Sequence, residues 1–117
     1  MNFRTAASKL RGSITVMTST FELNNLQVLN IGCKPYKDDD GDLVVYVELS
    51  SIDGGTIPCD LSLKINLYDS EGNIYMINDY YISAESFTGY DTTEMDCFDS
   101  SHTLEIAVSG RLYVSRA

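Results

Sequence analysis

Apolar and polar side chains alternate along most of this chain, most regularly between residues 59 and 82. A period of two is typical of a β-strand with one buried and one exposed face. The longest run places these apolar residues on one face: Cys59, Leu61, Leu63, Ile65 and Leu67. The run stops at residues 69–73, Asp-Ser-Glu-Gly-Asn, and resumes at Ile74. An aspartate and a glycine in such a break predict a hairpin turn.

Shorter alternating segments lie on both sides of this hairpin. Residues 43–49 place Leu43, Val45, Val47 and Leu49 on one predicted inner face. Residues 29–35 alternate and end at a proline, which cannot donate to a central strand ladder. Apolar positions change parity between residues 14 and 23, which predicts one bulged strand or two short ones. Residues 104–114 predict a last strand, whereas residues 83–102 are polar with scattered apolar anchors.

About seven or eight short strands separated by turns favour an all-β fold. We predict an antiparallel β-sandwich with an immunoglobulin-like Greek-key arrangement, and a small β-barrel is the alternative. Helical spacing is confined to Phe3, Ala6, Ala7 and Leu10. Residues 1–12 are therefore predicted to form a short helix or arm, and residues 13–117 a single sandwich domain.

The charge of the chain excludes some classes of partner. Seventeen acidic residues against eight basic ones give a net charge of −9, and residues 1–11 hold three of the basic ones and no acid. The acidic remainder is expected to repel phosphate backbones and anionic lipids, so neither nucleic acid nor membrane is an expected partner. Three cysteines favour a reducing compartment. We expect a cytoplasmic protein, or a cell-envelope one if the chain belongs to an exported protein.

One acidic loop is a candidate calcium site. Asp38, Asp39, Asp40 and Asp42 surround a glycine, and carboxylates in a loop are the hard oxygen ligands that Ca²⁺ prefers. The EF-hand pattern is absent, because the three acids are consecutive and position 50 is serine. The other interpretation is a solvated turn whose charges discourage association of sheet edges.

No other cofactor and no enzymatic activity is expected. Cys33, Cys59, Cys97 and His102 could supply four zinc ligands, but none of them forms the closely spaced pair that structural zinc sites use. The chain has one histidine and lacks a nucleophile elbow, a phosphate-binding glycine loop and a zinc-protease motif.

The predicted binding residues are tyrosines of the hairpin. They are Tyr68, Tyr75, Tyr80 and Tyr81, with Tyr90 soon after. Exposed tyrosines provide rigid, amphipathic contact area and are enriched at recognition surfaces. The alternative is that they only cover a sheet face, as good strand formers. We predict a contact surface over residues 67–82, used by a protein partner or for self-association through an edge strand.

The segment Ile65-Asn66-Leu67-Tyr68-Asp69, with its glycine-containing turn, resembles the FxLYD-type domains of bacterial proteins. The similarity covers residues 43–82. It implies a small immunoglobulin-like sandwich, found on envelope or secreted proteins, with no established catalytic activity. The chain departs from that pattern by isoleucine instead of phenylalanine at position 65 and by the long polar segment 83–102.

Together these features predict a non-enzymatic bacterial module for protein interaction or structure. One alternative is an acidic immunity- or inhibitor-type protein that binds a basic effector, steered by its charge. Another is a calcium-stabilised envelope module.

Overall fold

The computed structural model describes residues 2–37 and 41–117, and in this part of the chain strands predominate. The elements are α1 (Phe3–Arg11), β1 (Ile14–Val16), α2 (Thr18–Glu22), β2 (Leu26–Pro35), β3 (Leu43–Ser51), β4 (Leu61–Tyr68), β5 (Ile74–Ile82), β6 (Tyr90–Cys97), α3 (Thr103–Ile106) and β7 (Ser109–Arg116). The prediction of a mainly β protein is confirmed. The chain is not all-β, however, because three short helices accompany the strands.

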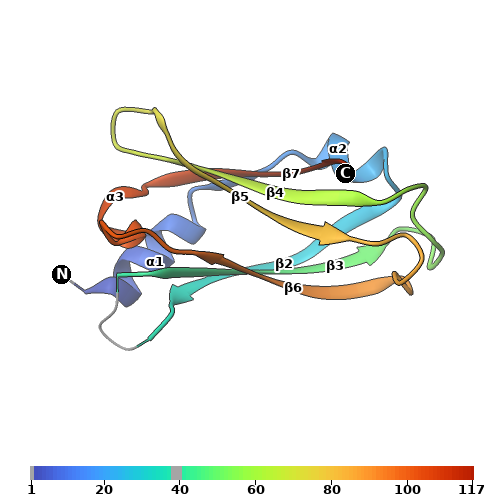
Figure 1. Cartoon of the computed structure of the whole chain (residues 1–117), viewed down its shortest axis with the longest axis horizontal. Coiled ribbons are helices and arrows are strands. Elements are labelled where there is room, and N and C mark those ends of the chain that lie inside the picture. The colour runs from blue at the N-terminus through green and yellow to red at the C-terminus, as the bar shows by residue number, and fades with distance from the viewer. Residues whose placement is uncertain (1, 38–40) are drawn as a thin grey trace.

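The strands form two sheets that lie face to face as a sandwich (Figure 1). One sheet has the strand order β1-β7-β4-β5, and the other has the order β2-β3-β6. Among the described residues, all strand pairings are antiparallel except that of β1 with β7, which is parallel. Each sheet ends in edge strands rather than closing on itself, so the alternative of a small barrel is wrong.

The connections between the two sheets interlock two pairs of neighbouring strands. β3 pairs with β6 in one sheet, and β4 pairs with β7 in the other. The chain passes from β3 to β4 and again from β6 to β7, so the two pairs are linked to each other by crossings between the sheets. In this arrangement the paired strands turn their inner side chains toward the opposite sheet.

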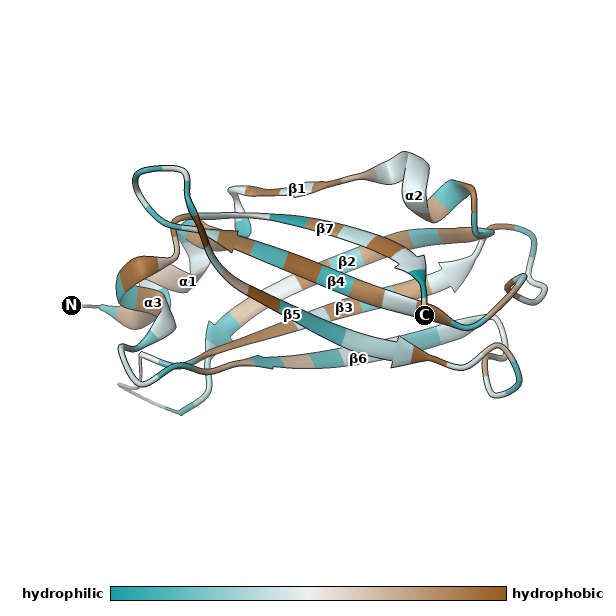
Figure 2. Cartoon of the chain, turned by 45° about the horizontal axis from the view of Figure 1, so that its top comes forward, coloured by the Kyte–Doolittle hydropathy of each residue, from teal (hydrophilic) through white to brown (hydrophobic). Residues whose placement is uncertain are grey.

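The core consists of the alternating positions that the sequence predicts for β3 and β4. Leu43, Val45, Val47, Leu49, Leu61, Leu63, Ile65 and Leu67 are all fully buried. Figure 2 shows the corresponding apolar and polar bands along β4. Full burial of each such side chain contributes about 1.5–3 kcal/mol to folding. Cys59 continues the same alternation in sequence but lies before β4 and is only half-buried.

Helix α1 covers one side of the sandwich. The Asn2 side chain caps its first turn by accepting a hydrogen bond from the Thr5 backbone N–H at 3.1 Å. Ala7 and Leu10 are buried in the common core, and the Arg11 Nε donates to the Ile31 carbonyl at 2.6 Å. The helical spacing therefore describes the observed helix, which packs against β2.

The prediction of strand structure throughout residues 14–23 is wrong in its second half. β1 ends at Val16, and residues 18–22 form helix α2, which buries Phe21. The Thr20 hydroxyl in this helix accepts a hydrogen bond from the Val114 backbone N–H at 3.2 Å. Helix α2 thus covers the edge of β7 beyond the short stretch that pairs with β1. The apolar positions change parity in the sequence because the chain changes there from a strand to a helix.

Two predictions near the C-terminus also require correction. The polar segment 83–102 contains a full strand, β6, whose inner face is made by Thr93, Met95 and Cys97, all buried. Two of these three residues carry little apolar surface, so the alternation does not stand out in the sequence. Residues 103–106 are helical, and the last strand therefore begins at Ser109 rather than at Leu104.

Candidate functional site

The β4–β5 hairpin carries the tyrosines that the sequence singles out. Its turn is built by Asp69, whose Oδ1 accepts hydrogen bonds from the backbone N–H groups of Glu71 and Asn73, both at 3.0 Å. Gly72 adopts φ +82°, a conformation that only glycine takes without strain. The predicted turn is confirmed, and it leaves β5 as an edge strand beside β4.

A bulge next to this turn decides which way the tyrosines point. The register shifts between Leu67 and Tyr68, which pair with Met76 and Ile74, so that Tyr75 is the extra residue. As a result Tyr75 packs against the core although Ile74 and Ile77 are exposed. Strict alternation would have placed Tyr75 and Ile77 on the same face.

The four predicted tyrosines therefore belong to two groups. Tyr75 and Tyr80 are partly buried and pack against the core, whereas Tyr68 and Tyr81 lie on the outer face of the sheet. The Arg111 guanidinium lies 5.7 Å from the centre of the Tyr68 ring, a cation–π distance. Tyr81 is 59% exposed. The structure does not gather these four side chains into one site.

Carboxylates hold several of these hydroxyl groups. The Tyr81 hydroxyl donates to Asp60 at 2.6 Å, and this hydrogen bond is the largest cause of a raised Tyr81 pKa and a lowered Asp60 pKa. Burial, followed by the nearby Asp91 carboxylate, raises the pKa of Tyr80. Tyr80 and Tyr81 thus have carboxylate partners within the chain. These contacts stabilise the fold whether or not the two tyrosines also bind a partner.

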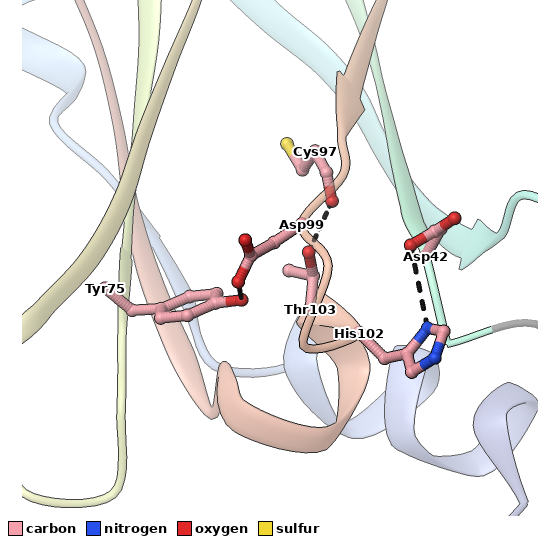
Figure 3. A network of polar contacts seen from close by, with 6 residues as sticks. All are labelled: Asp42, Tyr75, Cys97, Asp99, His102 and Thr103. Carbon is pink, nitrogen blue, oxygen red and sulfur yellow. Dashed lines mark hydrogen bonds and ion pairs between the residues drawn. The ribbon is translucent and has the colours of Figure 1, made fainter.

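Tyr75 belongs to a polar network at one end of the sandwich (Figure 3). Its hydroxyl donates to the Asp99 carboxylate, and burial together with this carboxylate raises its pKa to about 12. In the same network the Thr103 hydroxyl donates to the Cys97 carbonyl at 2.6 Å. The first contact fastens β5 to the segment that follows β6, and the second holds the start of α3 against the end of β6. Tyr75 therefore acts as a structural clamp in the fold, and its predicted binding role stays a prediction.

The exposed isoleucines of β5, Ile74 and Ile77, are a feature that the sequence prediction missed. Ile74, Ile77 and Tyr81 are 56%, 57% and 59% exposed on the outer face. Lys64, Arg111 and the half-buried Tyr113 lie on the same face of the neighbouring strands. We call these six residues the β5 face. The sequence did contain a sign of this exposure. Ile77 pairs with Asn66, which belongs to the alternating positions of β4 that are polar and face outward.

The candidate calcium loop falls mostly outside the described residues. Asp38, Asp39 and Asp40 lie there, so the prediction for them stays a prediction. The Asp42 carboxylate lies 3.9 Å from Nδ1 of His102, as Figure 3 shows. In residues 2–37 and 41–117 no three potential metal ligands come together.

The cysteines are separate thiols. Cys33 on β2 and Cys97 on β6 lie on opposite sides of β3, opposite Val45 and Leu43. Two strand spacings alone amount to about 9–10 Å, and the two-residue offset along β3 adds to the separation of their Cα atoms, which is beyond the range that a disulfide bridges. Burial raises the pKa of Cys33 to about 12 and that of Cys97 to about 11.

Comparison with known proteins supports the fold alone. No family profile matches the chain, and no curated protein is significantly similar to it, so the FxLYD resemblance stays a prediction. The crystal structure of Campylobacter jejuni cj0090 is similar with a TM-score of 0.50 and 14% identity, over 90% of this chain and 98% of that one. A putative β-galactosidase from Bacteroides fragilis aligns with a TM-score of 0.34 and 13% identity, over 80% of this chain and 16% of that one. At such values the second likeness has no bearing on activity.

Proposed function

We propose that this chain is a non-enzymatic interaction module that binds an extended segment of a protein at the β5 face. The observation that carries the proposal is the position of β5, an edge strand whose outer face leaves three large apolar side chains more than half exposed. An edge strand offers unpaired backbone groups to an added strand, and alternate side chains then provide specificity. The partner can be another protein or a second copy of the chain.

The composition of the β5 face suits this role. Tyrosine and arginine are enriched in protein interfaces, and Ile74 and Ile77 add apolar area beside them. Lys64 and Arg111 place two cations on this face, and Asp79, which pairs with Lys64, places one acid there. A partner segment with mainly apolar side chains would complement this surface.

Two further features support a role without catalysis and an immunoglobulin-like assignment. Cys33 and Cys97 have raised pKa values and remain thiols near neutral pH, a poor state for a nucleophile. The interlocked pairs β3–β6 and β4–β7 match the Greek-key pattern of immunoglobulin-like sandwiches. In that assignment β1 occupies an edge position and runs parallel to β7.

A site-specific photo-crosslinker tests the proposed surface. We would place it at Ile77, and as a matched control at Tyr90, which is 52% exposed on the opposite sheet. The chain would be expressed in its native cells and irradiated there. We expect a discrete adduct from position 77, with a partner or a second copy, and none from position 90. No adduct at 77, or the same adducts from both positions, would contradict the proposal.

The alternative function, an acidic inhibitor of a basic effector, is favoured by the acidic outer face of the sheet β2-β3-β6. On the outer face of β2-β3-β6, Glu48, Glu94 and Asp96 occupy neighbouring strands. A basic effector steered to this face would associate at a rate that falls steeply with ionic strength. Association at the β5 face should depend little on salt. Stopped-flow association of the crosslinked partner at low and high salt separates the two functions.

A further inference from the structure

One carboxylate of β6 points between the two sheets. Asp91 pairs with Leu49, which is fully buried, and it shares its parity on β6 with the buried residues Thr93 and Met95. Cross-strand partners lie on the same face of a sheet, so Asp91 faces inward near the start of its strand, where it is half-buried. Charged side chains are seldom placed on an inner face unless they have a partner.

No basic side chain of this protein pairs with Asp91. Its neighbour on the facing sheet is Tyr80, which lies opposite the buried Leu63 and whose pKa is raised by burial and then by the Asp91 carboxylate. A hydroxyl stabilises a carboxylate without cancelling its charge. No ion pair joins Asp91 to another described residue, and Met1 and Asp38–Asp40, which lie outside the described part, carry no basic side chain. The charge of Asp91 therefore has no counter-charge from a side chain.

A hollow of about 410 Å³ opens beside Asp91 and Tyr80, where the chain turns from β5 into β6. Figure 1 shows the end of β5 and the start of β6 at the same end of the sandwich. We call this space the β5–β6 hollow. Its other lining residues are the buried Ile82 and Phe87 and the hydroxyl-bearing Tyr81, Ser83, Ser86, Thr88 and Tyr90. A volume of this size is within the range of small-molecule sites.

Three hydroxyl groups of the β5–β6 hollow are available to a ligand. Those of Ser83, Ser86 and Thr88 make no hydrogen bond to another described residue. Each hydroxyl oxygen can accept a hydrogen bond, and the Asp91 carboxylate can accept several. The hollow thus combines acceptors and one negative charge with an apolar surface. A primary ammonium group has the three donors and the positive charge that complement these acceptors.

We propose that the β5–β6 hollow binds a small organic cation, a primary ammonium group on a short apolar body. Asp91 pairs with the ammonium group through charge-assisted hydrogen bonds, and the apolar body packs against Ile82 and Phe87. The tyrosine rings add surfaces that attract a cation. An anion is disfavoured, because no lysine, arginine or histidine lines the hollow and the net charge of the chain is −9.

This hollow and the β5 face can fail as sites independently of each other. The hollow requires a free small molecule between the sheets, whereas the β5 face requires a protein segment on the outer face. Tyr81 alone belongs to both sets of residues. The amides from Ser83 to Asp91 therefore report on the hollow.

The test is a titration of the intact chain with benzylammonium near neutral pH, followed by amide NMR at constant ionic strength. We expect saturable shifts centred on residues 83–91. Benzyl alcohol, which has the same shape and no charge, should bind at least about tenfold more weakly. Because this comparison uses the wild type, it does not depend on the folding of any variant.

Asp91→Asn should also bind benzylammonium at least about tenfold more weakly, since asparagine keeps the shape and an acceptor but loses the charge. Asp96→Asn is the matched control, because it removes the same charge from the exposed outer face of the same strand and should bind as the wild type does. Amide spectra recorded before the titration report whether each variant is folded.

Three results would overturn the proposal. One is the absence of saturable shifts at residues 83–91, and the second is equal affinity for benzylammonium and benzyl alcohol. The third is equal weakening in both variants, which would reduce the effect to net charge. In each of these cases Asp91 would serve only as an inward charge that keeps the edge of β6 from pairing with another chain.

Discussion

The hydroxyl of Tyr75 donates a hydrogen bond to the carboxylate of Asp99, which lies twenty-four residues later in the chain. This contact joins the edge strand β5 of one sheet to the segment that follows the edge strand β6 of the other. Asn78 reinforces the same seam, since its side-chain amide donates to the Asp96 carbonyl at 2.6 Å. The two edges on this side are thus tied by side chains, because no backbone ladder connects the sheets.

Tyr75→Phe should weaken this seam. The substitution keeps the ring and removes the hydroxyl, so Asp99 loses its donor in a partly buried position, at a cost of about 1–2 kcal/mol in the free energy of unfolding. Urea denaturation measures it. Tyr81→Phe is the matched control, because Asp60 keeps its hydrogen bond from the Ala84 N–H at 2.8 Å and both groups are exposed. Equal losses in the two variants would refute the clamp role of Tyr75.

The same tyrosine should make stability depend on alkaline pH. Its pKa rises from the ordinary 10.0 to about 12 on folding, so between these values the folded chain binds a proton that the unfolded chain has lost. The contribution is complete below pH 10 and lost as pH rises toward 12. Ultraviolet titration of tyrosinate should show a group with a pKa of about 12 in the wild type that Tyr75→Phe lacks. A wild-type curve without it would contradict the prediction.

Gly41→Ala should collide with His102. The added Cβ would lie 2.5 Å from the Cβ of His102, closer than two carbons approach, and we expect a loss of about 2 kcal/mol. His102 itself has φ +63°, so His102→Gly removes both the obstacle and a strained backbone. The double variant should therefore be as stable as His102→Gly alone in urea denaturation.

Gly12→Ala is the control for this pair. An added Cβ there has no neighbour closer than 3.6 Å and the residue is in the helical region, so stability should change by less than about 0.5 kcal/mol. Strictly additive losses in the double variant of Gly41 and His102 would show that the two residues do not meet.

Thr20→Val should expose the edge of β7. The hydroxyl accepts from the Val114 N–H at 3.2 Å and donates to the Met17 carbonyl at 2.8 Å. Its removal should cost about 1 kcal/mol and speed hydrogen exchange at the Val114 amide. Thr18→Val is the matched control, since that hydroxyl reaches only the Val16 carbonyl at 3.5 Å. Unchanged exchange at Val114 in Thr20→Val would mean that α2 does not protect this edge.

Cys33 and Cys97 should not form a disulfide with each other. With β3 between them they are too far apart to bridge without breaking two strand pairings. After mild oxidation and unfolding, a non-reducing peptide map should contain no Cys33–Cys97 crosslinked fragment. Cys33→Ser should leave the thiol count of the remaining cysteines unchanged. Detection of the crosslinked fragment from folded chain would contradict the strand order.

The sequence by itself determined the parts of this protein in which local pattern and burial agree. β3 and β4 alternate along most of their length because each has one face in the core, and the Asp69–Asn73 turn follows from the local chemistry of aspartate and glycine. The excess of acid is likewise a property of composition. None of these features requires knowledge of what lies across the sandwich.

The tertiary structure decided the rest, because other segments supply the reason. β6 is a strand because β3 pairs with it, although Thr93 faces the core and is satisfied there by the Val47 carbonyl at 3.2 Å. A single bulged residue turns Tyr75 inward and leaves Ile77 outside. A hollow between α1 and the end of β2 is lined by Arg4, Lys34 and Lys37, cations that are about thirty residues apart in the chain. Position along the chain does not encode such contacts, since packing between distant segments creates them.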